Sequence, residues 1–473
     1  MMAEPRWARR AFLKKAGQGL AALPLIAAMP ASVGAQEAVD HRREHGASPA
    51  ASQSVGIHLN VRDFGAVGDG QTKDTLPVQL ALDRCSVLGG GEVLVPAGDY
   101  LTGALAIRSN TVLRIDAGAT LLGSPDPADY PITEVRWEGR WIRGYLGYIY
   151  ANDAENIAIT GPGKITGNNA IMGRVDRETG MRHPALIEFT NCRNVRLEGC
   201  VTSQNGMWSI HPVYCDNVTI RNLIVHGGAD GIDVDSCRHV AIEGCSFDTG
   251  DDCISLKSGR GEEGNVINRP TEDVRISNCT FVDHRWACIG IGSETSAGIR
   301  NVHIEHCKCV GAGTYAIYIK SRPGRGAFIE NIYMNDLEVS GAKQGFLRLN
   351  FADSGKQDEF PVPGVKGIPT VAEFHFSNIR VTDVPVLVEA TGIDPQKPLN
   401  GFSLVNVAGT CGKGVFLANT NHAQLRDIRV TGCAGSLLNV SNVTGTGLAG
   451  AAKLQPSKSP DAVPETSEPY VLK

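Results

Sequence analysis

The chain has 473 residues, with 45 lysines and arginines against 50 aspartates and glutamates, a net charge of −5. This excess of acid argues against a nucleic-acid partner, because phosphate binding requires a basic face. The length exceeds that of an average compact domain, but it suits one solenoid, whose core grows along an axis instead of outward.

Residues 1–35 are predicted to be a twin-arginine export signal. Arg9 and Arg10 precede a mildly apolar run, and the small residues 33–35 supply a cleavage site. The run is too short and too rich in alanine, glycine and proline for a membrane-spanning helix. Removing the signal takes away five basic residues and one acidic residue and leaves a net charge of −9. We therefore expect a periplasmic or extracellular protein that does not bind a membrane.

The rest of the chain divides into a linker (36–56), a repeated region (57–447) and a polar tail (448–473) that is expected to be disordered. Within the repeated region, the pattern of Thr75 to Cys85 predicts an amphipathic helix that caps the first coil. A cap is needed because an open coil end exposes unpaired backbone groups and apolar side chains.

Each repeat starts with a polar residue and continues with alternating apolar and polar residues, as a strand with one buried face should. From Asn194 onward the intervals between starts are 23, 22, 34, 28 and 30 residues. Such a period predicts one repeat per coil, with the excess over 22 forming loops that leave one side. The starting residue suits a turn with left-handed backbone geometry. The repeats start at Asn156, Asn194, Asn217, His239, Asp273, Asn301 and Asn331.

The predicted fold is therefore all-β, a single right-handed parallel β-helix with an N-terminal capping helix. Three of the 13 cysteines, Cys192, Cys215 and Cys237, are spaced by one coil and are expected to stack inside the helix as free thiols. An aromatic-rich insert, Tyr130 to Tyr150, fits either a wall of a sugar-binding groove or a lid on the core.

The stretch Gly228 to Gly259 concentrates six aspartates between short apolar runs. Asp230 and Asp251 are 21 residues apart, so Asp230 is expected to lie on the coil next to Asp251 and Asp252. Carboxylates placed so closely shift each other's pKa, and such an arrangement is typical of a functional site. The other three aspartates are interpreted as turn residues: Asp233, Asp235 and Asp248.

Four motifs in this order and spacing resemble the polygalacturonase-like glycoside hydrolases of family 28. They are D-G-I-D at Asp230, T-G-D-D-C-I-S-L-K-S-G ending at Gly259, I-G-S-E ending at Glu294 and I-K-S-R-P-G-R-G starting at Ile319. The resemblance extends from about residue 61 to 378 and implies hydrolysis of a pectic polysaccharide without a cofactor or metal. It implies catalytic roles for Asp230, Asp251 and Asp252, and substrate binding by Lys320, Arg322, Glu294 and Lys257.

The resemblance also implies inversion, with Asp251 as the general acid and Asp230 and Asp252 activating water. Two positions depart from the family pattern. Ala287 stands where the family has a histidine, and Tyr318 stands where it has an arginine that binds substrate carboxylate. Recognition of plain homogalacturonan is therefore in question, and Arg322 and Arg325 are candidates to compensate.

Two other functions stay open from the sequence. A polysaccharide lyase shares this type of fold, and an acidic cluster is able to hold Ca²⁺. A non-catalytic carbohydrate-binding β-helix is the second alternative. His211 is interpreted as a hydrogen-bonded structural histidine. We expect a monomer that acts on galacturonan-type or rhamnogalacturonan-type substrates.

Overall fold

The structure is a computed structural model that describes residues 56–171, 173–282 and 285–455, with residues 460, 462, 463 and 465. The predicted export signal and all of the predicted linker except Gly56 lie outside the described residues. Gly56–Tyr470 forms one compact unit. Within the described part, none of the helices combines the length and the apolar character needed to cross a membrane.

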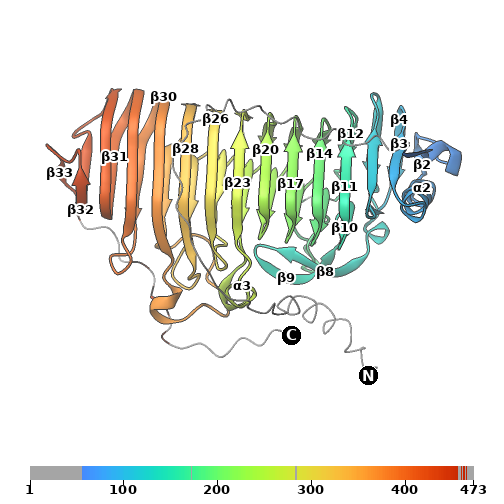
Figure 1. Ribbon diagram of the computed structural model, residues 1–473, viewed down its shortest axis with the longest axis horizontal. Coiled ribbons are helices and arrows are strands. Elements are labelled where there is room, and N and C mark those ends of the chain that lie inside the picture. Colours follow the sequence, from blue (N-terminus) through green and yellow to red (C-terminus); the bar gives the residue numbers. More distant parts are fainter. Residues whose placement is uncertain are drawn as a thin grey trace, which may run out of the picture. The chain divides into compact units, whose positions relative to one another are not determined.

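The described chain is a parallel β-helix, which confirms the predicted fold. Its strands form one 31-stranded sheet that winds around a buried core, and Figure 1 shows the coils following one another from blue to red along one axis. Neighbouring coils pair in parallel, and the crossover between parallel strands is right-handed.

Three series of strands run along the helix, and in the later coils the long strands β26, β28, β30 and β31 extend across more than one series. The first series is β1 (Ile57–Asn60), β3 (Gly91–Val95), β6 (Thr111–Ile115), β11 (Glu155–Thr160), β14 (Arg193–Glu198), β17 (Asp216–Arg221), β20 (Arg238–Glu243), β23 (Thr271–Ser277), β26 (Ile299–Val310), β28 (Phe328–Ser340), β30 (Thr370–Gly392), β31 (Leu399–Thr431) and β32 (Leu438–Thr446). The second series is β2 (Asp69–Lys73), β4 (Gly98–Thr102), β7 (Ala119–Gly123), β12 (Lys164–Thr166), β15 (Val201–Ser203), β18 (Ile224–Gly227), β21 (Ser246–Thr249) and β24 (Thr280–Val282). The third series is β5 (Leu105–Ala106), β10 (Ile149–Asn152), β13 (Ile187–Thr190), β16 (Ile210–Val213), β19 (Ile232–Asp235), β22 (Ile254–Lys257), β25 (Ile289–Ile291), β27 (Tyr315–Lys320) and β29 (Gly345–Asn350).

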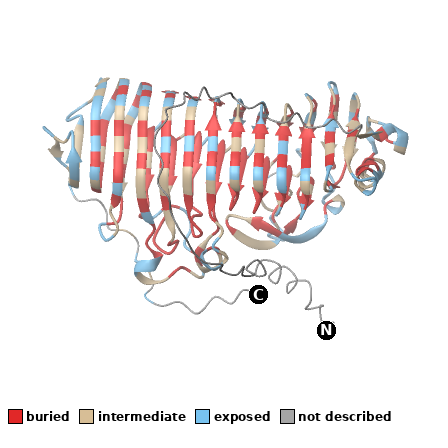
Figure 2. Cartoon of the chain, viewed as in Figure 1, coloured by how far each residue is buried: buried red, intermediate tan, exposed pale blue. Residues whose placement is uncertain are grey.

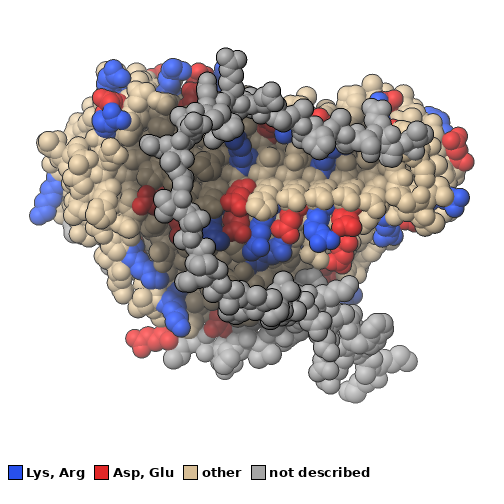
Figure 3. All heavy atoms as spheres, viewed as in Figure 1, with Lys and Arg blue, Asp and Glu red and all other residues tan. Residues whose placement is uncertain are grey.

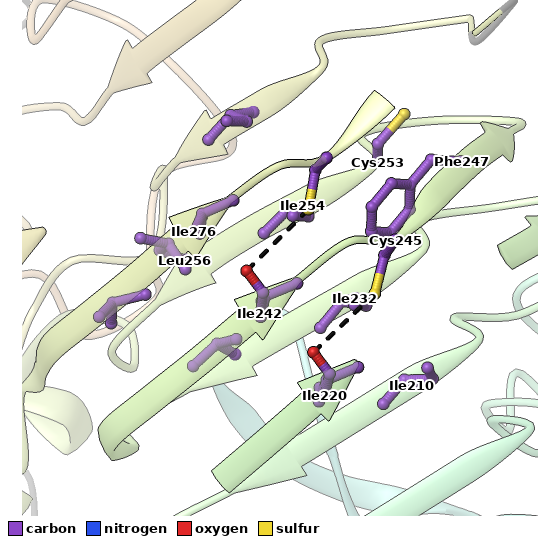
Figure 4. Packing of buried hydrophobic residues seen from close by; sticks show 14 of the residues in the cluster. Ile210, Ile220, Ile232, Ile242, Cys245, Phe247, Cys253, Ile254, Leu256 and Ile276 are labelled. Carbon is purple, nitrogen blue, oxygen red and sulfur yellow. Dashed lines mark hydrogen bonds between the residues drawn. The ribbon is translucent and has the colours of Figure 1, made fainter. Parts of the chain in front are cut away.

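Identical or similar apolar residues stack from coil to coil in the core. Ile210, Ile232 and Ile254 are register partners on β16, β19 and β22. Figure 4 shows this stack beside Ile220 and Ile242 of the first series. Each coil buries its apolar row against the next, so the hydrophobic effect fixes the strand register.

The cysteines behave as the spacing predicts. Cys192, Cys215 and Cys237 are buried free thiols, and the backbone N–H of Cys215 donates to Cys237 Sγ at 3.3 Å. All 13 cysteines lie in the described residues and none forms a disulfide.

The starting residue of each repeat adopts the predicted left-handed conformation. Asn194 has a φ of 56° and Asn217 a φ of 59°. Asn194 Nδ2 donates to Asn156 Oδ1 at 2.8 Å, and Asn217 Nδ2 donates to Asn194 Oδ1 at 3.0 Å. This side-chain ladder satisfies polar groups at one turn of successive coils.

The two ends of the β-helix are built differently. Helix α2 (Thr75–Val87) covers the first coil and buries Val78 and Leu82, as predicted. At the other end, β33 (Ala452–Lys453) pairs with β32. The end of the β-helix predicted at residue 447 is therefore too early. The polar composition of the tail gave no sign of the short strand β33. The remaining helices are α3 (Gly261–Ile267) and the 3₁₀ segments η1 (Val61–Phe64), η2 (Pro127–Asp129) and η3 (Gly364–Gly367).

The outer surface of the first series is charged and solvated. Figure 2 shows buried and exposed residues alternating along its strands, and Figure 3 shows acidic and basic side chains side by side on this face. Ion pairs join neighbouring coils, such as Arg193 with Glu155 at 2.8 Å and Arg238 with Glu272 at 2.8 Å. Opposite charges paired across strands stabilise the sheet without forming a site.

Candidate active site

The predicted catalytic aspartates lie at the turn that leads into the third series. Ile232 pairs with Ile254, so Asp230 is opposite Asp252 on the next coil, and Gly231 N–H donates to the Asp252 carbonyl at 3.0 Å. Asp251 is one residue before Asp252. The structure therefore brings together the three carboxyl groups that the spacing predicts.

Asp251 is the most exposed of the three, with a side chain 28% accessible. Burial first, and then the negative charges of Asp230 and Asp252, raise the pKa of Asp251 to about 6. Arg174 opposes this shift through an ion pair with Asp251 Oδ2. A carboxyl group in this state retains its proton in mildly acidic solution and is suited to proton donation.

Asp230 is held in the opposite state. Burial alone would raise its pKa, but the charges of Lys257 and Arg174 outweigh burial and hold the pKa below its ordinary value. Lys257 Nζ is 3.3 Å from Asp230 Oδ2, and Arg174 Nη2 is 3.4 Å from Asp230 Oδ1. Asp230 is therefore a carboxylate under conditions in which Asp251 still carries a proton.

Lys257 also forms an ion pair with Asp233, which is fully buried on β19. Burial, and then the neighbouring Asp230, raise the pKa of Asp233 well above its ordinary value. Lys257 Nζ lies 4.1 Å from the centre of the Trp208 ring. Two carboxyl groups and one ammonium group thus share one buried site.

Asp252 receives three hydrogen bonds. Lys320 Nζ donates to Oδ2 at 2.9 Å, Ser255 Oγ donates to Oδ2 at 3.1 Å, and Ala287 N–H donates to Oδ1 at 3.0 Å. A Cβ atom on Gly290 would lie only 2.6 Å from Asp252 Oδ2. The missing side chain at Gly290 therefore leaves room for the Asp252 carboxylate.

Sequence reasoning missed Arg174, which contacts both Asp230 and Asp251. It lies in the loop between β12 and β13, outside the repeated strands. The signal was the 38-residue interval between Asn156 and Asn194, which exceeds one coil and therefore marks a loop on one side.

The interpretation of Asp233 and Asp235 as turn residues is wrong. Both lie in β19 and are buried, and Asp235 Oδ2 is 3.0 Å from Nε of the buried Arg136. The outward face of this strand is covered by a distant hairpin, which no local pattern reveals. Asp248 is 56% exposed on β21 and lies near His226.

That hairpin is formed by β8 (Ile132–Trp137) and β9 (Arg140–Tyr145). Arg182 fixes it above the third series, because its guanidinium donates to the carbonyls of Arg136 and Tyr145 and pairs with Glu188 on β13. The aromatic insert is therefore a lid that covers the third series from β13 to β19.

His211 lies beneath this lid, fully buried between strands β13 and β19. Its ring is 4.7 Å from the ring of Trp208, and Nδ1 is 3.9 Å from Glu188 Oε1. Burial, and then Arg182 and Lys257, hold the pKa of His211 well below its ordinary value, so the ring is neutral. A neutral, inaccessible imidazole fits the structural role that the sequence analysis gives it, although neither ring nitrogen has a hydrogen-bond partner in the described residues.

The sequence profile described as glycosyl hydrolases family 28 matches residues 85–447. The chain belongs to this family, and the protein is a glycoside hydrolase. It is 28% identical over 361 residues to a probable polygalacturonase of Vitis vinifera, covering 73% of this chain and 72% of that protein. It is 27% identical to an exo-poly-alpha-D-galacturonosidase of Dickeya chrysanthemi, covering 73% of this chain and 64% of that protein.

Solved structures of exopolygalacturonases have a similar fold. The exopolygalacturonase of Thermotoga maritima superposes with a TM-score of 0.70 at 27% identity, covering 80% of this chain and 92% of that chain. The family 28 exopolygalacturonase of Yersinia enterocolitica also has a TM-score of 0.70, at 24% identity, covering 82% of this chain and 78% of that chain, and it supports the fold.

The two departures from the family 28 pattern have clear positions. Ala287 is fully buried and holds Asp252 through its backbone N–H, so no side chain projects there. Tyr318 is 8% exposed on β27, and its hydroxyl is 3.0 Å from Ser354 Oγ. Neither residue supplies a positive charge for an acidic sugar.

The remaining predicted residues lie around the trio. Glu294 is buried in the loop after β25, where its charge helps to raise the pKa values of Lys257 and Lys320. Arg322 is buried and donates to the Gly355 carbonyl at 2.5 Å. Arg325 is fully buried and fixed by Ser293, Lys356 and Asp358. The expectation that Arg325 compensates for the missing arginine is therefore wrong.

Within the described residues, no group of three or more His, Cys, Asp or Glu side chains is arranged to hold a metal ion. Lys257 pairs with Asp230 and Lys320 pairs with Asp252, so ammonium groups already balance the charge of these carboxylates.

Proposed function

We propose that this family 28 hydrolase cleaves galacturonosyl linkages of pectic polysaccharides or oligosaccharides with inversion. The observation that carries the proposal is that three carboxyl groups lie together on two neighbouring coils, with Asp251 partly exposed and Asp230 buried 3.3 Å from Lys257. Paired acids in different environments are what glycoside hydrolysis requires, and the raised pKa of Asp251 and the lowered pKa of Asp230 agree with this. Inversion is proposed from the family resemblance. The printed names of the relatives, polygalacturonases and an exo-galacturonosidase, support the substrate class.

In this mechanism Asp251 gives its proton to the leaving glycosidic oxygen. Asp230 and Asp252 accept hydrogen bonds from a water molecule and remove its proton as it attacks the anomeric carbon from the opposite face. Lys257 keeps Asp230 ionised, and Lys320 donates to Asp252. A rhamnogalacturonan backbone is the alternative substrate, because Ala287 and Tyr318 replace two recognition residues of the family pattern.

We further propose attack from a chain end. Upstream of the trio, the outward row of the third series is closed, since Glu188 is 3% and His211 0% exposed beneath the hairpin. Downstream, the row becomes accessible at Arg348 on β29. A site closed on its upstream side accommodates a chain terminus, and the names of two relatives include exo action.

Product analysis on polygalacturonate, rhamnogalacturonan and defined oligomers tests these proposals. Monomer or dimer release with little early loss of viscosity supports exo action on galacturonan, and NMR of the first product gives its anomeric configuration. An unsaturated, ultraviolet-absorbing product that disappears on chelation would instead indicate a lyase. Absence of any product from every polymer would favour a binding protein.

The pKa of Asp251 predicts the alkaline limit of activity. Because the general acid must be protonated, kcat/KM is expected to fall tenfold per pH unit above about pH 6. Initial rates on a galacturonate oligomer between pH 3.5 and 8 check this. A rate that is level up to pH 8 would contradict Asp251 as the acid.

Arg174 is expected to set the position of this pH profile. It lowers the pKa values of both Asp251 and Asp230, so Arg174→Gln should move the alkaline and the acidic limbs to higher pH and reduce kcat. Arg177→Gln changes an exposed arginine of the same loop and is the matched control. Unchanged limbs in Arg174→Gln would show that Arg174 does not act on these carboxyl groups.

Export through the twin-arginine route and a monomeric state are also part of the proposal. The proposal of export rests on Arg9 and Arg10 within residues 1–35. Cell fractionation of the full chain and of an Arg9→Lys, Arg10→Lys variant tests export, and light scattering tests the monomer.

A further inference from the structure

Three basic side chains follow one another along the third series, and two of them already have carboxylate partners. Lys257 pairs with Asp230 and Asp233, and Lys320 pairs with Asp252. The third is Arg348 on β29, which no motif of the family resemblance includes. Its charge is not used by the catalytic trio.

Arg348 is the register partner of Tyr318 on β27. Its Cζ lies 5.2 Å from the centre of the Tyr318 ring and 5.8 Å from the centre of the Tyr315 ring. Tyr318 is itself fixed by its hydroxyl, which lies 3.0 Å from Ser354 Oγ and 3.4 Å from Asn350 Nδ2. Two aromatic rings thus hold the guanidinium in place and leave it partly exposed.

No carboxylate of the described residues forms an ion pair with Arg348. Glu389 on β30 is its register partner, but the hydrogen bond that Glu389 accepts comes from Thr391 Oγ1. Cation–π contact leaves the N–H groups at the edge of the guanidinium plane able to donate to an anion. Arg348 is therefore a fixed, partly exposed positive charge that keeps donor capacity.

The position of Arg348 relates it to the bound substrate. From Asp252 the sheet continues through β22, β25, β27 and β29. Three strand spacings separate the catalytic coil from Arg348, about 14 Å at about 4.8 Å per strand. This distance is longer than one pyranose ring, so Arg348 is beyond reach of the sugar residues at the scissile bond.

We propose that Arg348, supported by Tyr315 and Tyr318, binds the carboxylate of a uronate residue at a distal subsite on the C-terminal side of the trio. The inference rests on the proposed action on galacturonan and adds a specificity determinant to it. A guanidinium accepts a carboxylate through two parallel hydrogen bonds, which a neutral or esterified sugar does not offer. In the family pattern an arginine stands at the position of Tyr318. Arg348 supplies a positive charge one coil further along the helix.

The test compares Arg348→Gln with the unchanged enzyme on oligogalacturonates from two to six residues. We expect KM to rise about tenfold for the oligomers long enough to reach Arg348, with kcat little changed and the dimer unaffected. On long oligomers whose carboxylates are methyl-esterified, the unchanged enzyme and Arg348→Gln should have the same KM. Arg348→Lys should recover part of the affinity, because lysine keeps the charge without the two-pronged geometry.

Arg380→Gln is the matched control, because Arg380 is exposed on β30 and pairs only with a surface glutamate, Glu338, at 3.0 Å. If the unchanged enzyme cleaves all oligomers and Arg348→Gln keeps the same KM for each length, the distal subsite is refuted while the proposed function stands. An equal rise in KM for the dimer and the hexamer would indicate a structural effect and also refute it. If the unchanged enzyme neither cleaves nor binds galacturonates, the proposed function and the subsite both fail.

Discussion

Asp251→Asn is expected to lower kcat by about 10³-fold while leaving the affinity for oligosaccharide nearly unchanged. The amide has nearly the same shape as the acid but cannot transfer a proton to the leaving oxygen. The loss should appear in kcat and kcat/KM equally, because the proton is transferred only in the transition state. Steady-state kinetics together with calorimetric binding of a galacturonate oligomer separate the two quantities.

Asp248→Asn provides the matched control for this variant. Asp248 lies three residues before Asp251 in the chain, but its side chain is 56% exposed and lies near His226. Its replacement should leave kcat and KM within about twofold, as surface substitutions usually have small effects. Near-normal turnover in Asp251→Asn would return Asp251 to the role of a turn residue.

The repeated pattern made the fold and the trio predictable. Once each coil has about 22 residues, the apolar rows must align to bury their faces, and this fixes the register that places Asp230 opposite Asp252. The polar residue at the start of each repeat has the expected left-handed backbone, as Asn194 and Asn217 show. These features depend only on residues within one coil and its neighbours.

The features that sequence reasoning missed depend on contacts between distant segments. Asp235 looks like a turn aspartate because a glycine lies nearby. In the structure it accepts a hydrogen bond from Arg136, which is 99 residues away in the covering hairpin. The long interval between Asn156 and Asn194 indicates the loop that holds Arg174, but nothing in the sequence shows that this loop contacts Asp251. Arg348 lies in a strand of ordinary pattern, and only the register with Tyr318 reveals its aromatic support.

Lys257→Met is expected to have the largest effect on stability, about 3–5 kcal/mol at neutral pH. The replacement leaves the ionised Asp230 buried without its counter-charge, and the removal of one partner of a buried ion pair costs more than the pair contributes. The methionine fills most of the space beside the Trp208 ring, so the change tests charge more than volume. The free energy of unfolding in denaturant measures the loss.

The pH dependence gives this variant a distinctive signature. Without Lys257 the pKa of Asp230 in the folded protein rises above its value in the unfolded chain, so the ionised form penalises folding. The stability of Lys257→Met relative to the unchanged protein should therefore be worst near neutral pH and should recover as the pH falls and Asp230 takes up a proton. Lys308→Met, at a lysine 63% exposed beside Glu338, should show neither the loss nor the recovery.

A second substitution separates the charge from other effects of the change. In Lys257→Met, Asp233→Asn, one of the two buried carboxyl groups becomes a neutral amide of the same shape. Little of the lost stability should return, because the raised pKa of Asp233 already favours its protonated form, and hydrolysis should stay impaired because Asp230 no longer has the cation that lowers its pKa. Stability that does not change in Lys257→Met, or a double variant that regains the stability of the unchanged protein, would show that Asp230 is not the charge that Lys257 balances.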